Sequence, residues 1–384
     1  MSNTVYSKQR LFCPGPTPVP EAAVIAGMNA SVYHRTDSFY KDLLTCRQLL
    51  SPLFGTSELP LILTSSGTGA LEAALTNLTA EGDEVIVVDG GKFGNRWKKL
   101  AEAFGLKTHC IDLEWGTSLQ PEHVKEALKS NPNAKAVFFQ ANETSTGVHY
   151  DVEKITAAIK KVSSALVVVD AVSSIGAHSM KMDEWGVDCV VSGSQKGFGI
   201  PPGLAFICMS DVAWGRLSNR GRFYFDLQRE KTNQEKGATA WTPAITLIAS
   251  LKATLELMHK AGLENIFAHH KKAAEAVRAG IRAMGLELLT EVDPSYAVTA
   301  IKVPEGVDGV NVVKHLEKEY CAIFAGGQDQ LKGKIIRFGH LGFFDNLDVI
   351  AGMGALEMAL KDCGYDFSIG SGTAVVLEQL RAGR

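Results

Sequence analysis

Short apolar runs rich in β-branched residues alternate with amphipathic segments through the first half of the chain. The segments between most of these runs have the apolar spacing of an α-helix, as at 93–104, 121–130 and 151–162. Strands that are apolar throughout and separated by helices are typical of a mainly parallel sheet covered on both faces. The seven expected strands are 59–65, 83–90, 107–113, 134–140, 165–172, 189–195 and 204–210.

The connection between the last two expected strands is too short for a helical crossover. It covers residues 196–203, whereas parallel neighbours need about a dozen residues between them. We therefore expect strand 204–210 to run antiparallel to strand 189–195. The connection reads Lys-Gly-Phe-Gly-Ile-Pro-Pro-Gly, so a single cation, Lys196, lies in an otherwise uncharged turn.

The pattern changes after residue 245, where a smaller α+β domain is expected. A chain of 384 residues exceeds the length of about 250–300 at which a single hydrophobic core stops growing. We expect an N-terminal segment 1–20, a large domain 21–245 and a small C-terminal domain 246–384. The elements expected near and beyond the boundary are helices 243–260, 263–284, 309–319 and 345–361 and strands 297–304 and 335–340.

Composition narrows the functional class. The chain has 39 Lys and Arg against 42 Asp and Glu, a net charge of −3, so it lacks the basic excess of nucleic-acid-binding proteins. No apolar run approaches the roughly 18 residues of a membrane span, and the N-terminus has no apolar signal core. Seven cysteines without a CxxC pair suit a reducing compartment, and the ten histidines show no zinc-like spacing. We expect a cytoplasmic protein with no metal and no nucleic-acid or membrane partner.

Unusual residues follow several expected strands, where ligands bind in an open α/β sheet. After strand 59–65, Ser66, Gly67, Thr68 and Gly69 open a helix whose free N–H groups and dipole can hold a phosphate; the alternative is an ordinary turn. Phe93 follows strand 83–90 between glycines. Its ring either stacks on a planar ligand or belongs to the core.

Two charged residues complete this set. Asp170 ends the most apolar strand and either caps the next helix or pairs with a cationic ring nitrogen. Lys196 by itself would be a surface lysine, but its neutral neighbours let the amine lose water, which lowers its pKa and makes it a nucleophile. A phosphate cradle, a stacking ring, a carboxylate and such a lysine are together the contacts that pyridoxal phosphate requires.

At these residues the sequence resembles the class V aminotransferases of pyridoxal-phosphate fold type I. Within them it is most similar to the alanine–glyoxylate and serine–pyruvate or serine–glyoxylate aminotransferases. The similarity extends from "CPGPTPVPEA" to "IIRFGHLG", and the "SGSQK…PPG" run is highly specific. It implies a large domain with a seven-stranded, mainly parallel sheet containing one antiparallel strand, a smaller α+β domain, and pyridoxal phosphate as cofactor.

The resemblance also implies roles for individual residues. Lys196 would bond covalently to the cofactor, Asp170 would bind its pyridine nitrogen, and Val172 would touch the ring from the same side. Phe93 matches the stacking aromatic residue, and Arg337 matches the arginine that binds the substrate carboxylate. The remaining implied positions are Ser66, Gly67, Thr68 and Gln195 at the phosphate, Thr144 beside the ring and Gly15 near the substrate.

Relatives in this group share phosphate ligands across a homodimer, so the resemblance implies a homodimer here. Thr239 and Thr242 stand where some relatives have Tyr-x-x-Thr. The tyrosine is therefore missing, which makes Thr239 the less secure of the two.

The implied reaction is transamination by a ping-pong mechanism, from serine or alanine to glyoxylate or pyruvate. Three other classes of protein are alternatives to this aminotransferase group. A 2-aminoethylphosphonate–pyruvate transaminase stays open, because only the group around the amino carbon differs. Cysteine desulfurases usually have histidine before the lysine, where this chain has Gln195. A Rossmann-type nucleotide-binding protein needs G-x-G-x-x-G after its first strand, but here Gly67-Thr68-Gly69 is followed by Ala70-Leu71-Glu72.

Overall fold

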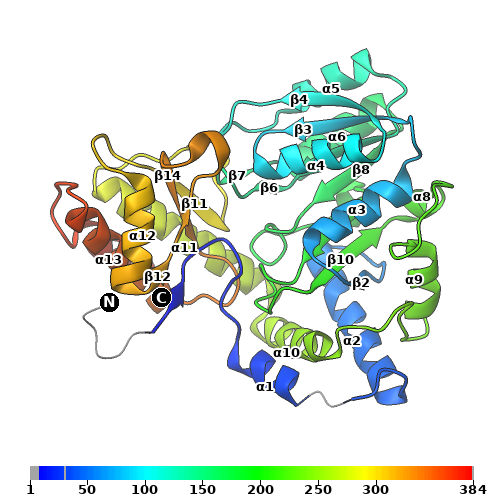
Figure 1. The fold of residues 1–384 in the computed structure, drawn as a ribbon, viewed down its shortest axis with the longest axis horizontal. Helices are drawn as coiled ribbons and strands as arrows, with labels where there is room; N and C mark the ends of the chain where they lie inside the picture. The colour runs from blue at the N-terminus through cyan, green and yellow to red at the C-terminus, as the bar shows by residue number, and fades with distance from the viewer. Residues whose placement is uncertain (1–7, 30–31, 383–384) are drawn as a thin grey trace.

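The seven predicted strands form one sheet in the computed structural model, which describes residues 8–29 and 32–382 (Figure 1). The order across the sheet is β2-β10-β9-β8-β5-β3-β4. Every strand begins within two residues of its predicted start. Their bounds are β2 (Leu61–Thr64), β3 (Glu84–Asp89), β4 (Lys107–Asp112), β5 (Ala136–Gln140), β8 (Leu166–Asp170), β9 (Cys189–Gly193) and β10 (Leu204–Met209).

One strand of this sheet is antiparallel, as predicted. β10 pairs antiparallel with both β9 and β2, with Ala205 opposite Gly193 and Ile207 opposite Leu61. The other neighbouring pairs are parallel. The carboxyl ends of β2, β3, β5, β8 and β9 therefore meet at the same edge of the sheet.

Helices cover both faces because successive residues of a strand point to opposite sides. Val85 and Val87 belong to the hydrophobic cluster on one face, whereas Ile86 and Val88 belong to the cluster on the other. The helices that pack on these faces are α3 (Gly67–Leu78) and α4 (Lys92–Ala103) on the first, and α2 (Asp37–Phe54), α5 (Pro121–Ser130), α6 (Val152–Val162) and α10 (Ile245–Ala261) on the second.

A second, smaller lobe contains a three-stranded sheet in the order β11-β14-β13 (Figure 1). Val277, Phe338 and Leu356 belong to its separate hydrophobic cluster. Its elements are α11 (Leu263–Ala283), β11 (Val298–Lys302), α12 (Gly309–Tyr320), β12 (Ala322–Ile323), β13 (Ala325–Gly326), the 3-10 turn η1 (Asp329–Leu331), β14 (Ile335–Gly339), α13 (Asn346–Asp362) and α14 (Ser371–Arg381).

The N-terminal part of the chain joins the two lobes. β1 (Arg10–Leu11) pairs in parallel with β12, and Gly339 donates its N–H to the carbonyl oxygen of Phe12 at 2.7 Å. α1 (Glu21–Met28) then packs against α10. α10 itself buries Ile248 and Leu251 in the cluster on the large sheet, and the domain boundary after residue 245 stays a prediction. Residues 1–7 of the predicted N-terminal segment lie outside the described residues.

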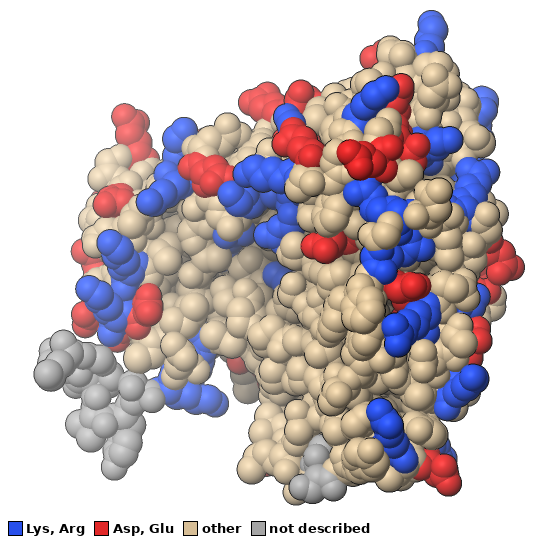
Figure 2. All heavy atoms as spheres, turned by 45° about the vertical axis from the view of Figure 1, so that its right-hand side comes forward, with Lys and Arg blue, Asp and Glu red and all other residues tan. Residues whose placement is uncertain are grey.

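Acidic and basic side chains are interspersed on the upper part of the face in Figure 2, and fewer charges lie below them. Within residues 8–29 and 32–382, no helix has both the length and the apolar character needed to cross a membrane.

A buried arginine anchors the strand that leads into the first site loop. Arg47 of α2 is 2% exposed. Its guanidinium donates to the carbonyl oxygens of Leu59 at 2.9 Å, Pro60 at 3.0 Å and Gln234 at 2.7 Å. These bonds hold the residues before β2 against the end of α9 (Leu227–Gln234), and thereby fix the edge of the sheet.

Replacing Arg47 by methionine should lower the free energy of unfolding by about 3 kcal/mol, because it leaves three carbonyl groups without their donor. Urea denaturation measures this loss. Lys41→Met removes an exposed cation from the same helix and should stay within about 0.5 kcal/mol of the parent chain. Equal effects of the two substitutions would contradict the anchoring role.

Candidate active site

A cavity of about 120 Å³ lies at the edge where the parallel strands end. Asp170 is the last residue of β8, and Lys196 follows β9 by three residues. The loops after β2, β3 and β5 contribute the rest of the wall. The lining residues are Ser66, Gly67, Thr68, Leu71, Phe93, Arg96, Asn142, Thr144, Asp170, Val172, Ser173, Gln195 and Lys196.

All the predicted cofactor residues line this cavity except Gly69, Thr239 and Thr242. Gly69 lies inside α3, where its N–H bonds the carbonyl oxygen of Ser66 at 2.9 Å and a Cβ would lie 1.9 Å from the hydroxyl oxygen of Ser65. Thr239 and Thr242 line a separate hollow beside β2 that shares no residue with the Lys196 cavity.

The residues of the predicted phosphate cradle lie at the start of α3. Ser66 is the residue before the helix, and Gly67 and Thr68 are its first two residues. The first N–H groups of a helix have no intrahelical acceptor and carry the positive end of its dipole. Arg96 adds a cation, because its Nη1 donates to the hydroxyl oxygen of Thr68 at 3.1 Å. A hydroxyl that accepts from arginine keeps its own hydrogen free to donate to an anion.

Lys196 is held in the cavity by the N-terminal segment. Its Nζ donates to the carbonyl oxygen of Pro14, and a Cβ on Gly15 would lie only 2.5 Å from Nζ. Burial, and to a lesser extent the cation of Arg337, lower the pKa of Lys196 to about 8, while the carboxylate of Asp170 opposes the change. The amine therefore reaches its neutral, nucleophilic form far below the usual pH for lysine.

Burial shifts the pKa of Asp170 in the opposite direction, because it disfavours the charged form of either group. Asp170 is 6% exposed, and burial raises its pKa to about 6. The N–H of Val172, which bonds Oδ1 at 2.9 Å, and the cation of Arg96 both favour the carboxylate. A cationic ring nitrogen beside this carboxyl group would restore its charge.

Arg337 approaches the cavity from the small lobe. It is buried on β14, and its Nε and Nη1 donate to the carbonyl oxygens of Gly326 at 3.0 Å and Thr144 at 3.1 Å. Burial lowers the pKa of this guanidinium to about 10, so it stays a cation at neutral pH. The hydroxyl of Thr144 makes a short hydrogen bond to the hydroxyl of Ser173.

The polar lining suits a ligand with several hydrogen-bonding groups. Among the described residues, Gln195 Oε1 and Asn142 Oδ1 are buried without a donor, and both residues line the cavity. An anionic phosphate fits the α3 terminus, a pyridine nitrogen fits Asp170 and an aldehyde fits the neutral amine of Lys196. The residues present therefore fit pyridoxal phosphate. Within the described part of the chain, no group of three or more His, Cys, Asp or Glu side chains could hold a metal ion.

Comparison with known families decides the class. Residues 21–331 match the family model described as aminotransferase class V. The chain belongs to the class V aminotransferases. It is therefore a transaminase, and pyridoxal phosphate is its cofactor.

Similar proteins cover nearly the whole chain. A serine–glyoxylate aminotransferase from Hyphomicrobium methylovorum is 38% identical, over 96% of this chain and 93% of its own length. A protein named soluble hydrogenase, small subunit, from a Synechococcus species is 41% identical, over 96% of this chain and 98% of its own. The structure of an aspartate aminotransferase of subgroup IV from Thermus thermophilus covers 92% of this chain and 99% of its own, with 34% identity and a TM-score of 0.87.

Several residues at this site were not predicted: Leu71, Arg96, Asn142 and Ser173 of the cavity wall, and Glu143 behind it. Arg96 lies one helical turn after Phe93, and its guanidinium lies 4.8 Å from the centre of the Phe93 ring. The i, i+3 spacing on the predicted helix was the available signal. Glu143 is fully buried and accepts from the N–H groups of Phe93 and Gly94, at 3.1 and 3.0 Å. Its neighbours in the sequence, Asn142 and Thr144, are polar and gave no sign of this burial.

The lowered pKa of Lys196 predicts how cofactor capture depends on pH. Only the neutral amine attacks an aldehyde, so the rate at which cofactor-free protein bonds pyridoxal phosphate should rise with pH and level off above about 8. Rapid-mixing absorbance between about pH 6 and 10 measures this rate. Lys196→Ala should show no such bonding. A rate that still rises steeply above about pH 9 would contradict the lowered pKa.

Proposed function

We propose that the chain moves the amino group of a small donor, serine or alanine, to glyoxylate or pyruvate by a ping-pong mechanism. The observation that carries this proposal is the closeness of the Pro14–Gly15 segment to Lys196, since even a Cβ on Gly15 would lie 2.5 Å from Nζ. We infer from this closeness that a long substrate side chain is disfavoured beside the lysine. The serine–glyoxylate relative supports the same substrate class.

Each side chain has a defined task in this proposal. When bound, pyridoxal phosphate supplies a carbon that bonds the donor's amino group and a ring that takes up electrons as the Cα–H bond breaks. Lys196 Nζ would take the proton from Cα and deliver it to the cofactor carbon that bonds the donor's nitrogen. The carbonyl oxygen of Pro14 orients this amine, because it already accepts a hydrogen bond from Nζ. Asp170 keeps a proton on the pyridine nitrogen.

We propose Arg337 as the residue that binds the substrate carboxylate. Its Nε and Nη1 are held by protein carbonyl groups, which fixes the plane of the guanidinium. Fixed orientation favours the planar, two-pronged recognition of a carboxylate. Arg337 is hydrogen-bonded to Thr144, and Thr144 lines the cavity that contains Lys196 and Asp170. The guanidinium is therefore close to these two groups.

The proposed substrates can be tested with the purified holoenzyme. Serine, alanine, aspartate and 2-aminoethylphosphonate should each be assayed with glyoxylate and with pyruvate. We expect the highest kcat/KM for serine or alanine with glyoxylate, and a more than about hundredfold lower kcat for Lys196→Ala, which still binds the cofactor. Preference for aspartate or for aminoethylphosphonate would overturn the small-donor proposal. Near-normal turnover by Lys196→Ala would overturn the role of the lysine.

We also propose a homodimer in which Thr242 serves the cofactor of the partner subunit. Thr242 is exposed, whereas the hydroxyl of Thr239 already donates to the carbonyl oxygen of Trp241 at 2.6 Å. The same chain exposes large apolar side chains that suit an interface between subunits. These are Val24, Ile25 and Met28 on α1, and Phe223 and Tyr224 near the Thr242 hollow.

Thr242→Val should therefore weaken binding of pyridoxal phosphate by about fivefold, through loss of one hydrogen bond to phosphate. Binding of pyridoxal, which lacks the phosphate, should not change. Thr239→Val is the matched control and should have the smaller effect. Absorbance titration measures the affinities, and light scattering measures the mass of the particle. A monomeric mass, or equal losses for the two ligands, would contradict the shared site.

A further inference from the structure

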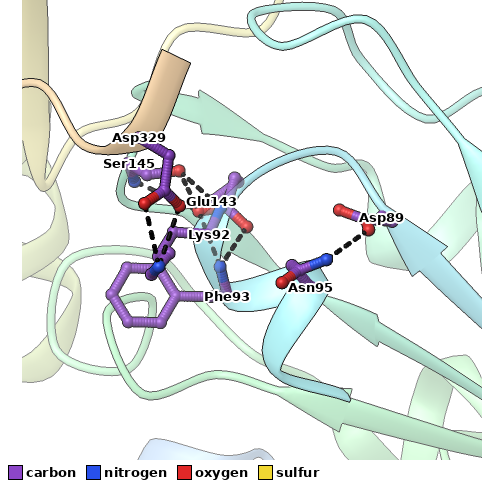
Figure 3. A network of polar contacts seen from close by, with 7 residues as sticks. All are labelled: Asp89, Lys92, Phe93, Asn95, Glu143, Ser145 and Asp329. Carbon is purple, nitrogen blue, oxygen red and sulfur yellow. Dashed lines mark hydrogen bonds and ion pairs between the residues drawn. The ribbon is translucent and has the colours of Figure 1, made fainter. Parts of the chain in front are cut away.

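Side chains of strand β6 (Asn142–Glu143) and of the turn that follows it hold the first turn of α4 (Figure 3). The N–H of Lys92 donates to the hydroxyl oxygen of Ser145 at 3.0 Å, and the N–H groups of Phe93 and Gly94 donate to Glu143 Oε2 at 3.1 and 3.0 Å. The first N–H groups of a helix need such external acceptors. The backbone that carries the Phe93 ring is therefore fixed from its N-terminal side.

The Glu143 carboxylate reaches these N–H groups because the residue before the helix is glycine. A Cβ on Gly91 would lie 2.4 Å from the carboxyl carbon of Glu143 and 2.6 Å from the hydroxyl oxygen of Ser145. That hydroxyl in turn donates to Glu143 Oε1 at 2.6 Å. Burial raises the pKa of Glu143, and its bonds to Ser145 and Gly94 oppose this change.

An ion pair links the same turn of α4 to the small lobe. Lys92 Nζ lies 2.8 Å from Asp329 Oδ2 and 3.1 Å from Oδ1 (Figure 3). Asp329 begins η1 with φ of 46°, a left-handed conformation that few residues other than glycine, asparagine and aspartate adopt. Strained backbone of this kind persists where its surroundings hold it, and here it points the carboxylate at Lys92.

Asp329 lies in the loop 326–332, and the first residue of this loop is hydrogen-bonded to Arg337. Gly326, the last residue of β13, accepts from Arg337 Nε at 3.0 Å, while Arg337 Nη1 bonds the carbonyl oxygen of Thr144. Thr144 lies between Glu143 and Ser145 in the chain. The segment 143–145 is therefore bonded both to the first turn of α4 and to Arg337 of the small lobe. The Lys92–Asp329 ion pair is a second connection between that turn of α4 and the small lobe.

We propose that Lys92 and Asp329 are positioning residues for transamination: their ion pair holds the loop 326–332 against the start of α4 and so fixes Arg337 relative to the Phe93 ring. This inference rests on the proposed function, in which Phe93 stacks on the cofactor and Arg337 binds the substrate carboxylate. Those two contacts come from different lobes, and a substrate bonded to the cofactor must satisfy both at once. Loss of the pair should therefore raise KM more than it lowers kcat.

The exposure of the pair makes this role sensitive to salt. The side chain of Lys92 is 32% exposed and that of Asp329 is 52% exposed. At an ionic strength of about 1 M the Debye length falls to about 3 Å, which screens an exposed pair. The contribution of Lys92 and Asp329 should then disappear in the parent holoenzyme as salt is added.

Asp329→Asn tests the proposal with little disturbance, because asparagine also tolerates the left-handed backbone. At low salt, kcat/KM of this variant with the best donor should be about fivefold lower than that of the parent holoenzyme, mainly because KM is higher. In about 1 M KCl, the variant and the parent should have equal kcat/KM. Lys92→Met should behave in the same way. The double variant should lose no more than either single variant, because both changes remove one interaction. Lys92→Arg, which keeps the charge, should retain activity.

Lys302→Met is the matched control. It removes a more exposed ion pair of the small lobe, in which Lys302 Nζ lies 3.0 Å from Glu287, and should leave kcat/KM unchanged. A loss in Asp329→Asn that persists in high salt, additive losses in the double variant, or an equal loss in Lys302→Met would each overturn the positioning role.

Two further measurements separate this inference from the proposed function. Visible circular dichroism of the bound cofactor reports the Phe93 side of the site without any substrate, and it should change in Asp329→Asn but not in Lys302→Met. If Phe93→Ala and Arg337→Met leave kcat/KM unchanged, the proposed site roles fail. If those variants lose activity while Asp329→Asn does not, only the positioning role fails.

Discussion

Burial of the large sheet on both faces is the constraint on which the site depends. With helices against each face, the strands have apolar side chains on both sides, and polar groups can leave the core only where a strand ends. Asp170 ends β8, and Lys196 follows β9 in a turn that reverses into β10. The short return of β10 keeps Lys196 beside Asp170 at this edge instead of sending the chain into another crossover helix.

Desolvation then gives these groups their reactivity. The same burial raises the pKa of Asp170 and lowers that of Lys196, so each is closer to its neutral form than in water. Hydrogen bonds define where each group points: the N–H of Val172 for the carboxylate, and the carbonyl oxygen of Pro14 for the amine. A site built in this way binds a ligand without first rearranging its charges, which is the physical meaning of preorganisation.

Periodicity predicted the strands well because strands buried on both faces are apolar throughout, and turn length predicted the direction of β10. The lateral order of the strands could not be predicted, because it is set by packing between distant segments such as β2 and β10. Predicted site residues that directly follow strands line one cavity for the same geometric reason, and their roles stay predictions. Arg96 was missed because its contact to Thr68 crosses between two helices, and Glu143 because a carboxylate in a loop is ordinarily exposed.

The pairing of β1 with β12 has a consequence for how the protein is made. Arg10 and Leu11 lie beside Ala322 and Ile323, and Phe12 is bonded to Gly339, immediately before the segment that covers Lys196. Residues 10–12 therefore cannot dock until residues 322–339 have been synthesised. The large sheet is complete in sequence long before that point. The pocket is thus completed only after these residues are made, and a chain that ends before them lacks the contacts that hold the segment before Pro14.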